Sequence, residues 1–285
     1  IIMSHSSNQK QITVPFIKNQ KGKEKITVLT AYDYPLAHIL DEVGIEIILV
    51  GDSLGTVIYG EPNTLSVTMD DMIRHTKAVT NAANRALVVA DMPFLSYQTS
   101  LETAVFNAGR FLKEARAQAI KLEGGLEVCE IIRAITRSGI PVMSHIGLTP
   151  QSIHTMGAYR IYGKSEKERQ YLIDSAYAVA EAGAFSVVLE CVEESVSKQI
   201  TKAISIPTIG IGSGKDCDGQ VLVTHDLIGL TAGRVPKFVE PLANVREVIS
   251  SALKVYISRT KSLPAPPQET TKSATAKGEH RALSN

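Results

Sequence analysis

Short apolar runs alternate with longer amphipathic stretches through most of the chain. The runs are rich in Val, Ile and Leu and are bounded by Gly, Pro or polar residues, a pattern typical of buried strands. The predicted strands are residues 26–30, 45–50, 86–90, 118–122, 139–144, 185–189, 206–210 and 235–238. The stretches between them repeat apolar residues at helical spacing. The predicted helices are residues 14–20, 35–43, 68–83, 100–115, 126–137, 166–182, 193–203 and 242–259.

This alternation predicts an α/β protein. Strands separated by helices form a parallel sheet, and eight such units in one domain predict a closed (β/α)8 TIM barrel. We expect residues 26–260 to form this single catalytic domain, preceded by an N-terminal arm, residues 1–25. An open, doubly wound sheet is the alternative, because Pro236 lies inside the last predicted strand. Residues 261–285 are rich in Pro, Ser, Thr and Lys and poor in apolar side chains, so we expect a disordered tail.

The composition narrows the class of protein. With 30 Lys and Arg against 29 Asp and Glu, the formal net charge is +1, which argues against a surface built for nucleic acid or anionic lipid. No stretch is long and apolar enough to cross a bilayer, and residues 1–25 lack the apolar core of a signal peptide. The 3 cysteines have no metal-binding spacing and suggest a reducing compartment. We therefore expect a cytoplasmic protein without a membrane or nucleic-acid partner.

Three neighbouring strands are each followed by a carboxylate. Asp52, Asp91 and Glu123 come directly after the second, third and fourth predicted strands. Because the active sites of barrels lie at the carboxyl ends of the strands, we expect these acids to approach one point. Carboxylate oxygens suit Mg²⁺, which keeps waters that two oxygens of a 2-oxo acid can replace. The alternative is that each acid only caps the helix that follows it.

Other reactive side chains are predicted at the same edge. Lys121 shares its strand face with Glu123 and would bind a substrate carboxylate or, as a neutral amine, form a Schiff base. Glu190 ends an apolar strand, where burial would raise its pKa and suit it to act as a general base. His145 follows the fifth strand and would either orient substrate or serve the structure alone. The remaining residues expected at this edge are Tyr32, Ser53, Ser213 and Lys237.

Two loops stand out from the ordinary connections. Residues 210–214 read Gly-Ile-Gly-Ser-Gly, but the spacing is not that of a dinucleotide fingerprint and no acidic partner strand follows. We therefore expect the glycines to permit a tight turn or a close backbone approach rather than nucleotide binding. The polar segment 147–164 is too long for a simple strand-to-helix connection, which predicts a lid or binding loop.

Several strings of residues are distinctive when taken together. They are Thr30-Ala-Tyr-Asp-Tyr34, Val50-Gly-Asp-Ser-Leu-Gly55, Ala90-Asp-Met-Pro-Phe94, Lys121-Leu-Glu-Gly-Gly125, His145-Ile-Gly-Leu-Thr-Pro-Gln-Ser152, Leu189-Glu-Cys191, Ile209-Gly-Ile-Gly-Ser-Gly214 and Asp218-Gly-Gln220. In content and order these strings resemble the ketopantoate hydroxymethyltransferase family of (β/α)8 enzymes. The resemblance extends from Ile12 to Val255 and includes none of the C-terminal tail.

The resemblance implies an enzyme of pantothenate and coenzyme A synthesis. It would transfer a one-carbon unit from 5,10-methylenetetrahydrofolate to 3-methyl-2-oxobutanoate, giving 2-dehydropantoate by way of a metal-stabilised enolate. The family would hold magnesium at Asp52, Asp91 and Glu123, bind the 2-oxo acid through the metal with Ser53 and Lys121, and use Glu190 as general base. It also implies a homo-oligomer, a decamer of two stacked rings.

Three other functions remain open on the residues alone. A metal-dependent 2-oxo acid lyase or mutase of the isocitrate lyase type would use a similar fold and similar chelation, but without folate. A Schiff-base aldolase would use Lys121 and would not need a metal. A non-catalytic scaffold is disfavoured because the acids, the base and the lysine are all present.

Overall fold

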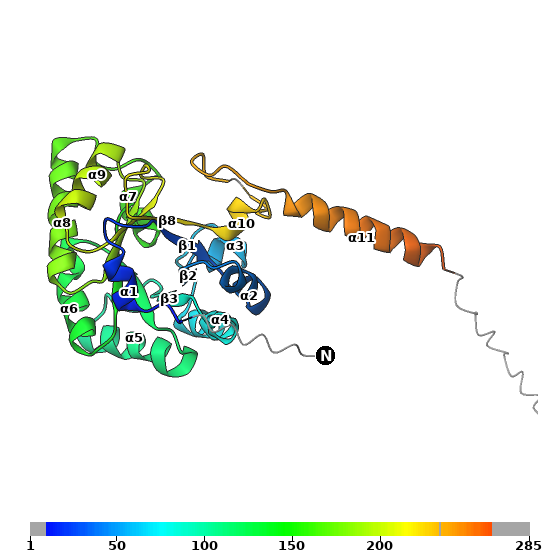
Figure 1. Ribbon diagram of the computed structural model, residues 1–285, viewed down its shortest axis with the longest axis horizontal. Helices are drawn as coiled ribbons and strands as arrows, with labels where there is room; N and C mark the ends of the chain where they lie inside the picture. Colours follow the sequence, from blue (N-terminus) through cyan, green and yellow to red (C-terminus); the bar gives the residue numbers. More distant parts are fainter. Residues whose placement is uncertain (1–9, 234, 264–285) are drawn as a thin grey trace, which may run out of the picture. The chain divides into compact units, whose positions relative to one another are not determined.

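Eight parallel strands close into a barrel in the computed structural model, which describes residues 10–233 and 235–263 (Figure 1). The strands are β1 (Ile26–Thr30), β2 (Ile47–Val50), β3 (Leu87–Asp91), β4 (Ala119–Glu123), β5 (Val142–Gly147), β6 (Ser186–Glu190), β7 (Thr208–Ile211) and β8 (Gly219–Leu222). Their order in the sheet follows the chain, and β1 pairs with both β2 and β8. The predicted (β/α)8 barrel is confirmed, and the open sheet is excluded because its two edges are joined.

Helices follow most of the strands and surround the barrel (Figure 1). The helices of the described chain are α1 (Val14–Asn19), α2 (Tyr34–Glu42), α3 (Leu54–Val57), α4 (Met69–Ala82), α5 (Leu101–Ala115), α6 (Cys129–Arg137), α7 (Ile153–Met156), α8 (Glu166–Glu181), α9 (Glu194–Ala203), α10 (Thr224–Leu227) and, in a separate unit, α11 (Val245–Lys261), with short 3₁₀ turns η1 (Leu126–Val128) and η2 (Pro150–Ser152). Side chains of Asp33, Thr68, Ser100 and Ser165 accept backbone N–H groups at the starts of α2, α4, α5 and α8. These caps explain why the helices begin close to their predicted positions.

The prediction of the eighth strand at residues 235–238 is wrong. The strand is Gly219–Leu222, which pairs with β1 on one side and β7 on the other. Pro236 has no N–H to donate to a sheet, which disfavours the predicted segment. The apolar pattern does not predict the true strand, because the strand is short and contains glycine and glutamine. Gly219 is required there, since a Cβ would lie 2.5 Å from the carbonyl oxygen of Ile26.

The alternation of side chains along each strand divides the core into two layers. Ala119 packs inside the barrel with residues of neighbouring strands, whereas Ile120 and Leu122 pack outward against the helices. Because successive side chains alternate, Lys121 and Glu123 lie on the inner face with Ala119. Inward-facing aliphatic side chains fill the barrel below them. The alternation along β4 therefore places the charged groups of Lys121 and Glu123 above the packed interior, at the carboxyl ends of the strands.

The N-terminal segment covers the opposite end of the barrel. Ile17 of α1 is fully buried in the same inner cluster as Ile26 and Phe185. Next to it, the carboxylate of Asp218 accepts hydrogen bonds from the ammonium of Lys21 at 2.8 Å and the backbone N–H of Gly22 at 3.0 Å. The predicted short helix at residues 14–20 is confirmed, and the arm is tied to the start of β8.

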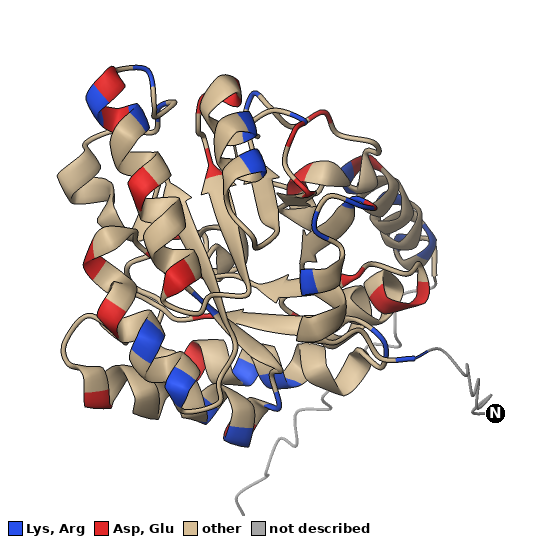
Figure 2. Ribbon diagram, turned by 60° about the vertical axis from the view of Figure 1, so that its left-hand side comes forward, with Lys and Arg blue, Asp and Glu red and all other residues tan. Residues whose placement is uncertain are grey.

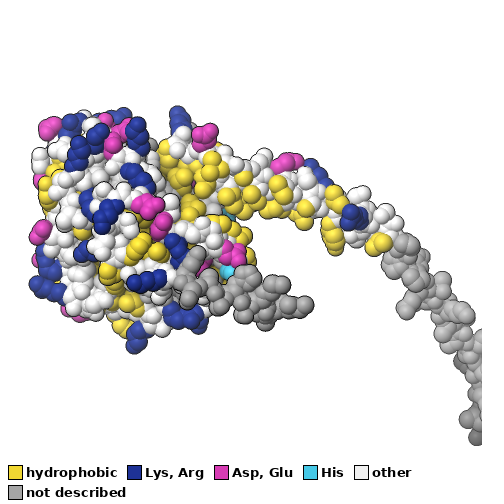
Figure 3. Space-filling model, viewed as in Figure 1, with side chains coloured by type: hydrophobic (Ala, Val, Ile, Leu, Met, Phe, Trp, Pro, Cys, Tyr) yellow, Lys and Arg dark blue, Asp and Glu magenta, His cyan; other side chains and the backbone are white. Residues whose placement is uncertain are grey.

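The last helix begins a second compact unit at Val245. α11 corresponds to the predicted helix 242–259, and none of its residues is buried. Val248, Ile249, Leu253 and Tyr256 are among its exposed apolar side chains. Apolar side chains gather into an exposed stripe along one side of the helix (Figure 3). Residues 1–9 and 264–285 lie outside the described part of the chain, so the expected disorder of the tail stays a prediction.

Charged residues of both signs are interspersed along the helices of the barrel (Figure 2). Many lie close enough to pair, as Arg110 and Glu114 do on α5 at 2.8 Å. This mixture agrees with the net charge of +1. Within residues 10–233 and 235–263, no helix has the length and apolar character needed to span a membrane.

Candidate active site

The predicted site residues come together at the carboxyl ends of the strands. Asp52, Ser53, Asp91, Lys121, Glu123, His145 and Glu190 all line one cavity of about 760 Å³. The register of the sheet fixes their order, because Asp91 pairs with Lys121 between β3 and β4, and Glu123 pairs with His145 between β4 and β5. All of them except Ser53 and Glu190 are buried. The expectation of a convergent site is therefore met in the position of each side chain.

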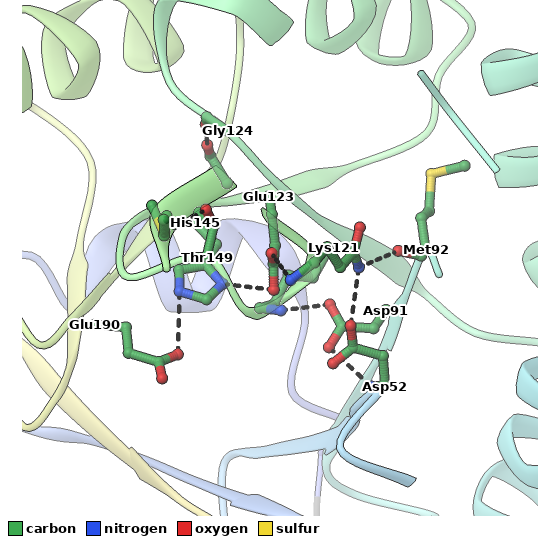
Figure 4. Close-up of polar contacts among 12 residues, drawn as sticks. Asp52, Asp91, Met92, Lys121, Glu123, Gly124, His145, Thr149 and Glu190 are labelled. Atoms are coloured by element: carbon green, nitrogen blue, oxygen red, sulfur yellow. Dashed lines mark hydrogen bonds and ion pairs between the residues drawn. The ribbon is translucent and has the colours of Figure 1, made fainter. Parts of the chain in front are cut away.

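Lys121 and Asp91 form a buried ion pair. The Lys121 ammonium lies 2.5 Å from Oδ1 of Asp91, and both side chains are almost fully enclosed (Figure 4). Burial by itself lowers the pKa of Lys121, but the charges of Asp91, Glu123 and Asp52 outweigh it and raise the pKa above its usual value. The amine is thus held protonated, which suits the binding of a substrate carboxylate. A Schiff-base lysine needs the opposite, a neutral amine.

The three acids carry more negative charge than the nearby cation balances. Burial raises the pKa of Asp52 to about 8, with further contributions from the charges of Asp91 and Glu123, against which Lys121 acts only in part. A buried carboxylate with such a raised pKa marks a place where additional positive charge would be favourable. The donor set and its charge therefore fit a hard divalent cation.

The carboxylates are not drawn together as a complete coordination shell. Among the described residues no group of three His, Cys, Asp or Glu side chains has the arrangement needed to hold a metal ion. Asp91 is turned to Lys121, while Asp52 and Glu123 each accept a hydrogen bond from Gln151. Magnesium commonly takes one or two carboxylates and completes its shell with water and substrate oxygens. The residues thus fit magnesium with substrate supplying ligands better than a closed all-protein site.

Gln151 joins the acids, and the sequence analysis missed it. Its side-chain nitrogen donates to Oδ2 of Asp52 and to the carbonyl of Met92, both at 2.9 Å, and its backbone N–H donates to Oε2 of Glu123 at 3.0 Å. The hydroxyl of Tyr97 lies 2.9 Å from the side-chain oxygen of Gln151 and fixes the direction of the amide. The signal for Gln151 was its place in the unusually long segment after β5. Nothing in the local sequence marks Tyr97.

His145 lies between two carboxylates. Its Nε2 is 3.2 Å from Oε2 of Glu190, and its Nδ1 is 3.5 Å from Oε1 of Glu123 (Figure 4). Burial and the charge of Lys121 lower the pKa of His145, but the two carboxylates outweigh them and raise it to about 9. A protonated imidazole at this place balances charge and holds Glu190 at the edge of the cavity, where 16% of its side chain is exposed.

The remaining predicted edge residues divide into those at the site and those that support it. The hydroxyl of Tyr32 lies 2.8 Å from Oγ of Ser53, which orients that serine at the cavity wall. Ser213 accepts from the N–H of Val192 at 2.9 Å and donates to the carbonyl of Leu189 at 2.7 Å, so it stabilises the end of β6. Lys237 does not follow a strand, because the eighth strand lies elsewhere.

Because the eighth strand was predicted at the wrong place, the sequence did not predict three residues that lie at the mouth of the barrel. Val223, His225 and Asp226 follow the true strand and line the cavity. His225 packs its ring against that of Tyr32, with 5.6 Å between centroids. The only signal in the sequence was the string Asp218-Gly-Gln220, which marks the strand before them.

Comparison with known sequences identifies relatives over nearly the whole chain. A profile of the family described as ketopantoate hydroxymethyltransferase matches residues 11–267. A protein of Syntrophus aciditrophicus named 3-methyl-2-oxobutanoate hydroxymethyltransferase is 53% identical over 268 residues, covering 94% of this chain and 98% of that protein. A protein of Geobacter metallireducens with the same name is 55% identical over 254 residues, covering 89% and 95%.

Solved structures with the same fold are more distant in sequence. Phosphonopyruvate hydrolase has a TM-score of 0.60 at 11% identity, over 90% of this chain and 92% of that one. For 2,3-dimethylmalate lyase, described as a member of the PEP mutase/isocitrate lyase superfamily, the TM-score is 0.56 at 14% identity, over 91% and 92%. Identities this low show the fold alone and do not favour the lyase alternative. The sequence match, in contrast, includes every site residue from Asp52 to Glu190, and the chain belongs to the ketopantoate hydroxymethyltransferase family.

Proposed function

We propose that this chain transfers a hydroxymethyl group to 3-methyl-2-oxobutanoate to give 2-dehydropantoate, with 5,10-methylenetetrahydrofolate as the one-carbon donor. The observation that carries the proposal is that one cavity holds both a charged Lys121 with three acids and an acid–imidazole pair, Glu190 and His145. The first group suits the binding of a 2-oxo acid, and the second suits the removal of a proton from it.

Substrate binding falls to the Lys121 side of the cavity. The ammonium of Lys121 would pair with the substrate carboxylate, and the hydroxyl of Ser53, oriented by Tyr32, would donate to it. These contacts would place the ketone toward Asp52 and Asp91, and C3 toward Glu190. His145 would lie beside the bound acid and help to orient it.

We further propose that Asp52, Asp91 and Glu123 hold a divalent cation, Mg²⁺. Bound there, it would stabilise as a Lewis acid the negative charge that develops on the ketone oxygen. The raised pKa of Asp52 supports this proposal, because burial and then the charges of Asp91 and Glu123 disfavour the carboxylate there, and a bound cation would offset both effects. Gln151 would keep Asp52 and Glu123 apart and correctly turned.

The proton transfer falls to Glu190. Its carboxylate would take the proton from C3, and the electron pair of the broken C–H bond would move into the enolate of the 2-oxo acid. The protonated ring of His145 would hold the carboxylate in place through its Nε2. The enolate carbon would then form a bond to the donor's methylene carbon, and both bonds from that carbon to the folate nitrogens would break. Water supplies the oxygen and hydrogen of the new hydroxyl group, while the proton taken from C3 and the second proton of the water end on the two nitrogens of tetrahydrofolate.

A direct assay tests the reaction. Purified protein with Mg²⁺, 3-methyl-2-oxobutanoate and 5,10-methylenetetrahydrofolate is expected to form 2-dehydropantoate, detected by mass spectrometry, and an equal amount of tetrahydrofolate. Formation of product without the folate, or cleavage of the 2-oxo acid, would contradict the proposal and would favour a lyase.

Oligomeric state and location extend the proposal. We infer a homo-oligomer, a decamer as the family resemblance implies. The exposed apolar stripe of α11 supports an interface at that helix. Light scattering coupled to size exclusion tests the number of copies. Cys129, Cys191 and Cys217 are all unpaired, which supports the proposed cytoplasmic location.

A further inference from the structure

The cavity is larger than the branched 2-oxo acid requires. Its volume of about 760 Å³ is in the range that accommodates a drug-sized ligand. The strand ends form only one part of its wall. Residues 56–62 after Ser53, and residues within 223–233 and 236–239 after β8, contribute the rest, which we call the outer lobe. The reactive groups of the proposed mechanism do not account for the outer lobe.

The outer lobe has an apolar and aromatic wall. Ile58, Tyr59, Leu230 and Phe238 all line it. The ring of Phe238 packs on the backbone of Gly212, where φ is +60° and a Cβ would lie 2.7 Å from the ring. Glycine is therefore required at that position, and the turn after β7 serves to seat an aromatic side chain. A wall of this kind favours a flat, ring-shaped ligand.

Two polar groups lie within this apolar wall. The Asp226 carboxylate is 7% exposed, and its Oδ1 accepts a hydrogen bond from the hydroxyl of Thr231 at 2.5 Å. The Nδ1 atom of His225 is buried and has no hydrogen-bond partner among the described residues. Both residues line the cavity. A buried polar atom without a partner is costly, so its presence beside a cavity points to a ligand that completes the bonding.

The acidic side chains of the outer lobe favour ligands that donate hydrogen bonds. The charged side chains among the described lining residues of the outer lobe are the acids Glu61 and Asp226. A ring that presents N–H and amino groups would find an acceptor in Asp226 and apolar surfaces on its faces.

We propose that the outer lobe binds the reduced pterin ring of the one-carbon donor, with Asp226 accepting hydrogen bonds from the ring amide N–H and its amino group. His225 supplies a further hydrogen bond, and Phe238 covers one face of the ring. This site rests on the proposed function, since it assumes that a folate is the donor. It adjoins Glu190 and Ser53 within the same cavity, so the one-carbon unit of the ring meets C3 of the 2-oxo acid.

Fluorescence offers a direct test, because the chain contains no tryptophan. Phe238→Trp places a single indole in the outer lobe, and Phe106→Trp places one on α5, where Phe106 is 70% exposed. Addition of tetrahydrofolate is expected to quench or shift the emission of the first variant in a saturable way and to leave the second without a saturable change. Saturable binding by calorimetry without a change in Phe238→Trp would overturn the proposed location.

A second pair of variants tests the hydrogen bonds. Asp226→Asn keeps the shape and the contact to Thr231 but no longer offers two acceptors, so the dissociation constant of tetrahydrofolate is expected to rise by roughly tenfold or more. Asp174→Asn, at an exposed position on α8, is the matched control and should not change it. An unchanged constant in Asp226→Asn would overturn the role of Asp226.

Isotope exchange at C3 of 3-methyl-2-oxobutanoate separates this inference from the proposed function. Exchange is measured with and without tetrahydrofolate in deuterated water, and it reports only the metal, the 2-oxo acid and Glu190. Exchange in wild type together with the expected results above supports both proposals. Exchange with unaltered folate binding in the variants overturns the outer lobe alone. Absence of exchange in wild type under both conditions overturns the proposed function and this inference with it.

Discussion

Lys121 on β4 and Asp91 on β3 are direct partners in the sheet register, and their side chains form a buried ion pair at 2.5 Å. The pairing is a consequence of the barrel, because parallel strands in this register bring the two inward-facing residues side by side. It holds the ammonium group that we propose binds substrate next to a carboxylate that we propose binds the metal. The chemistry of the site is thereby coupled to the closure of the sheet.

Replacing Lys121 with Met is expected to weaken the binding of the 2-oxo acid while leaving the binding of the metal intact. The variant keeps the length of the side chain but loses the ammonium, so we expect the KM for 3-methyl-2-oxobutanoate to rise by about 100-fold, as for loss of a buried charge-assisted contact. Calorimetry should show that Mg²⁺ still binds, because the acids remain. A KM close to that of wild type would contradict the proposed role of Lys121.

Gln151 is expected to organise the metal site without contacting the metal. Gln151→Ala removes the hydrogen bond that turns Asp52, and we expect the affinity for Mg²⁺ to fall by about 10- to 100-fold, as is typical when an outer-shell partner is lost. Titration with Mn²⁺ followed by electron paramagnetic resonance measures it. Gln170→Ala, on the exposed face of α8, is the control. Equal affinities in the two variants would show that Gln151 does not organise the site.

The hydrogen bonds that Asp218 accepts from the N-terminal segment and from β7 are predicted to make the free energy of unfolding depend on pH. Hydrogen bonds from Lys21, the backbone of Thr208 and that of Gly22 outweigh burial and lower the pKa of Asp218. A carboxyl group whose folded pKa is depressed stabilises the protein above its unfolded pKa of about 3.9, and this contribution is lost as the pH falls through the folded value.

Urea unfolding of Asp218→Asn checks this dependence. At pH 7 we expect the variant to lose about 1–3 kcal/mol of unfolding free energy, and the difference from wild type to shrink progressively below pH 4. Asp216→Asn, two residues earlier and paired with Lys198 at a more exposed site, should cost at most about 1 kcal/mol. A difference for Asp218→Asn that stays constant down to pH 3 would contradict the assignment.

Much of the site could be predicted from the sequence because it depends on periodicity. Once Lys121 and Glu123 are assigned to one strand, alternation puts both on the same face, and the strand ends of a barrel bring Asp52, Asp91 and Glu190 together. The position of every residue in that group was confirmed. Whether those acids hold a metal, and whether Glu190 is the base, stays a prediction.

The parts of the site and fold that the sequence did not predict depend on contacts between distant segments of the chain. Gln151 and Tyr97 lie 54 positions apart, and only the folded chain shows that their hydrogen bond orients the side-chain amide that donates to Asp52. β8 is four residues long and weakly apolar, and it is a strand because β1 and β7 both pair with it. Its misplacement concealed Asp226 and with it the outer lobe.

The central claim is that this site removes the proton from C3 of a 2-oxo acid. The most direct measurement is exchange of that hydrogen in deuterated water, followed by NMR, for wild type and Glu190→Gln with Mg²⁺ and then with EDTA. We predict exchange in wild type with Mg²⁺, a loss of at least about 100-fold in Glu190→Gln, and none in EDTA, while calorimetry shows that the variant still binds the 2-oxo acid. Exchange at the wild-type rate in Glu190→Gln, or in the presence of EDTA, would contradict the account.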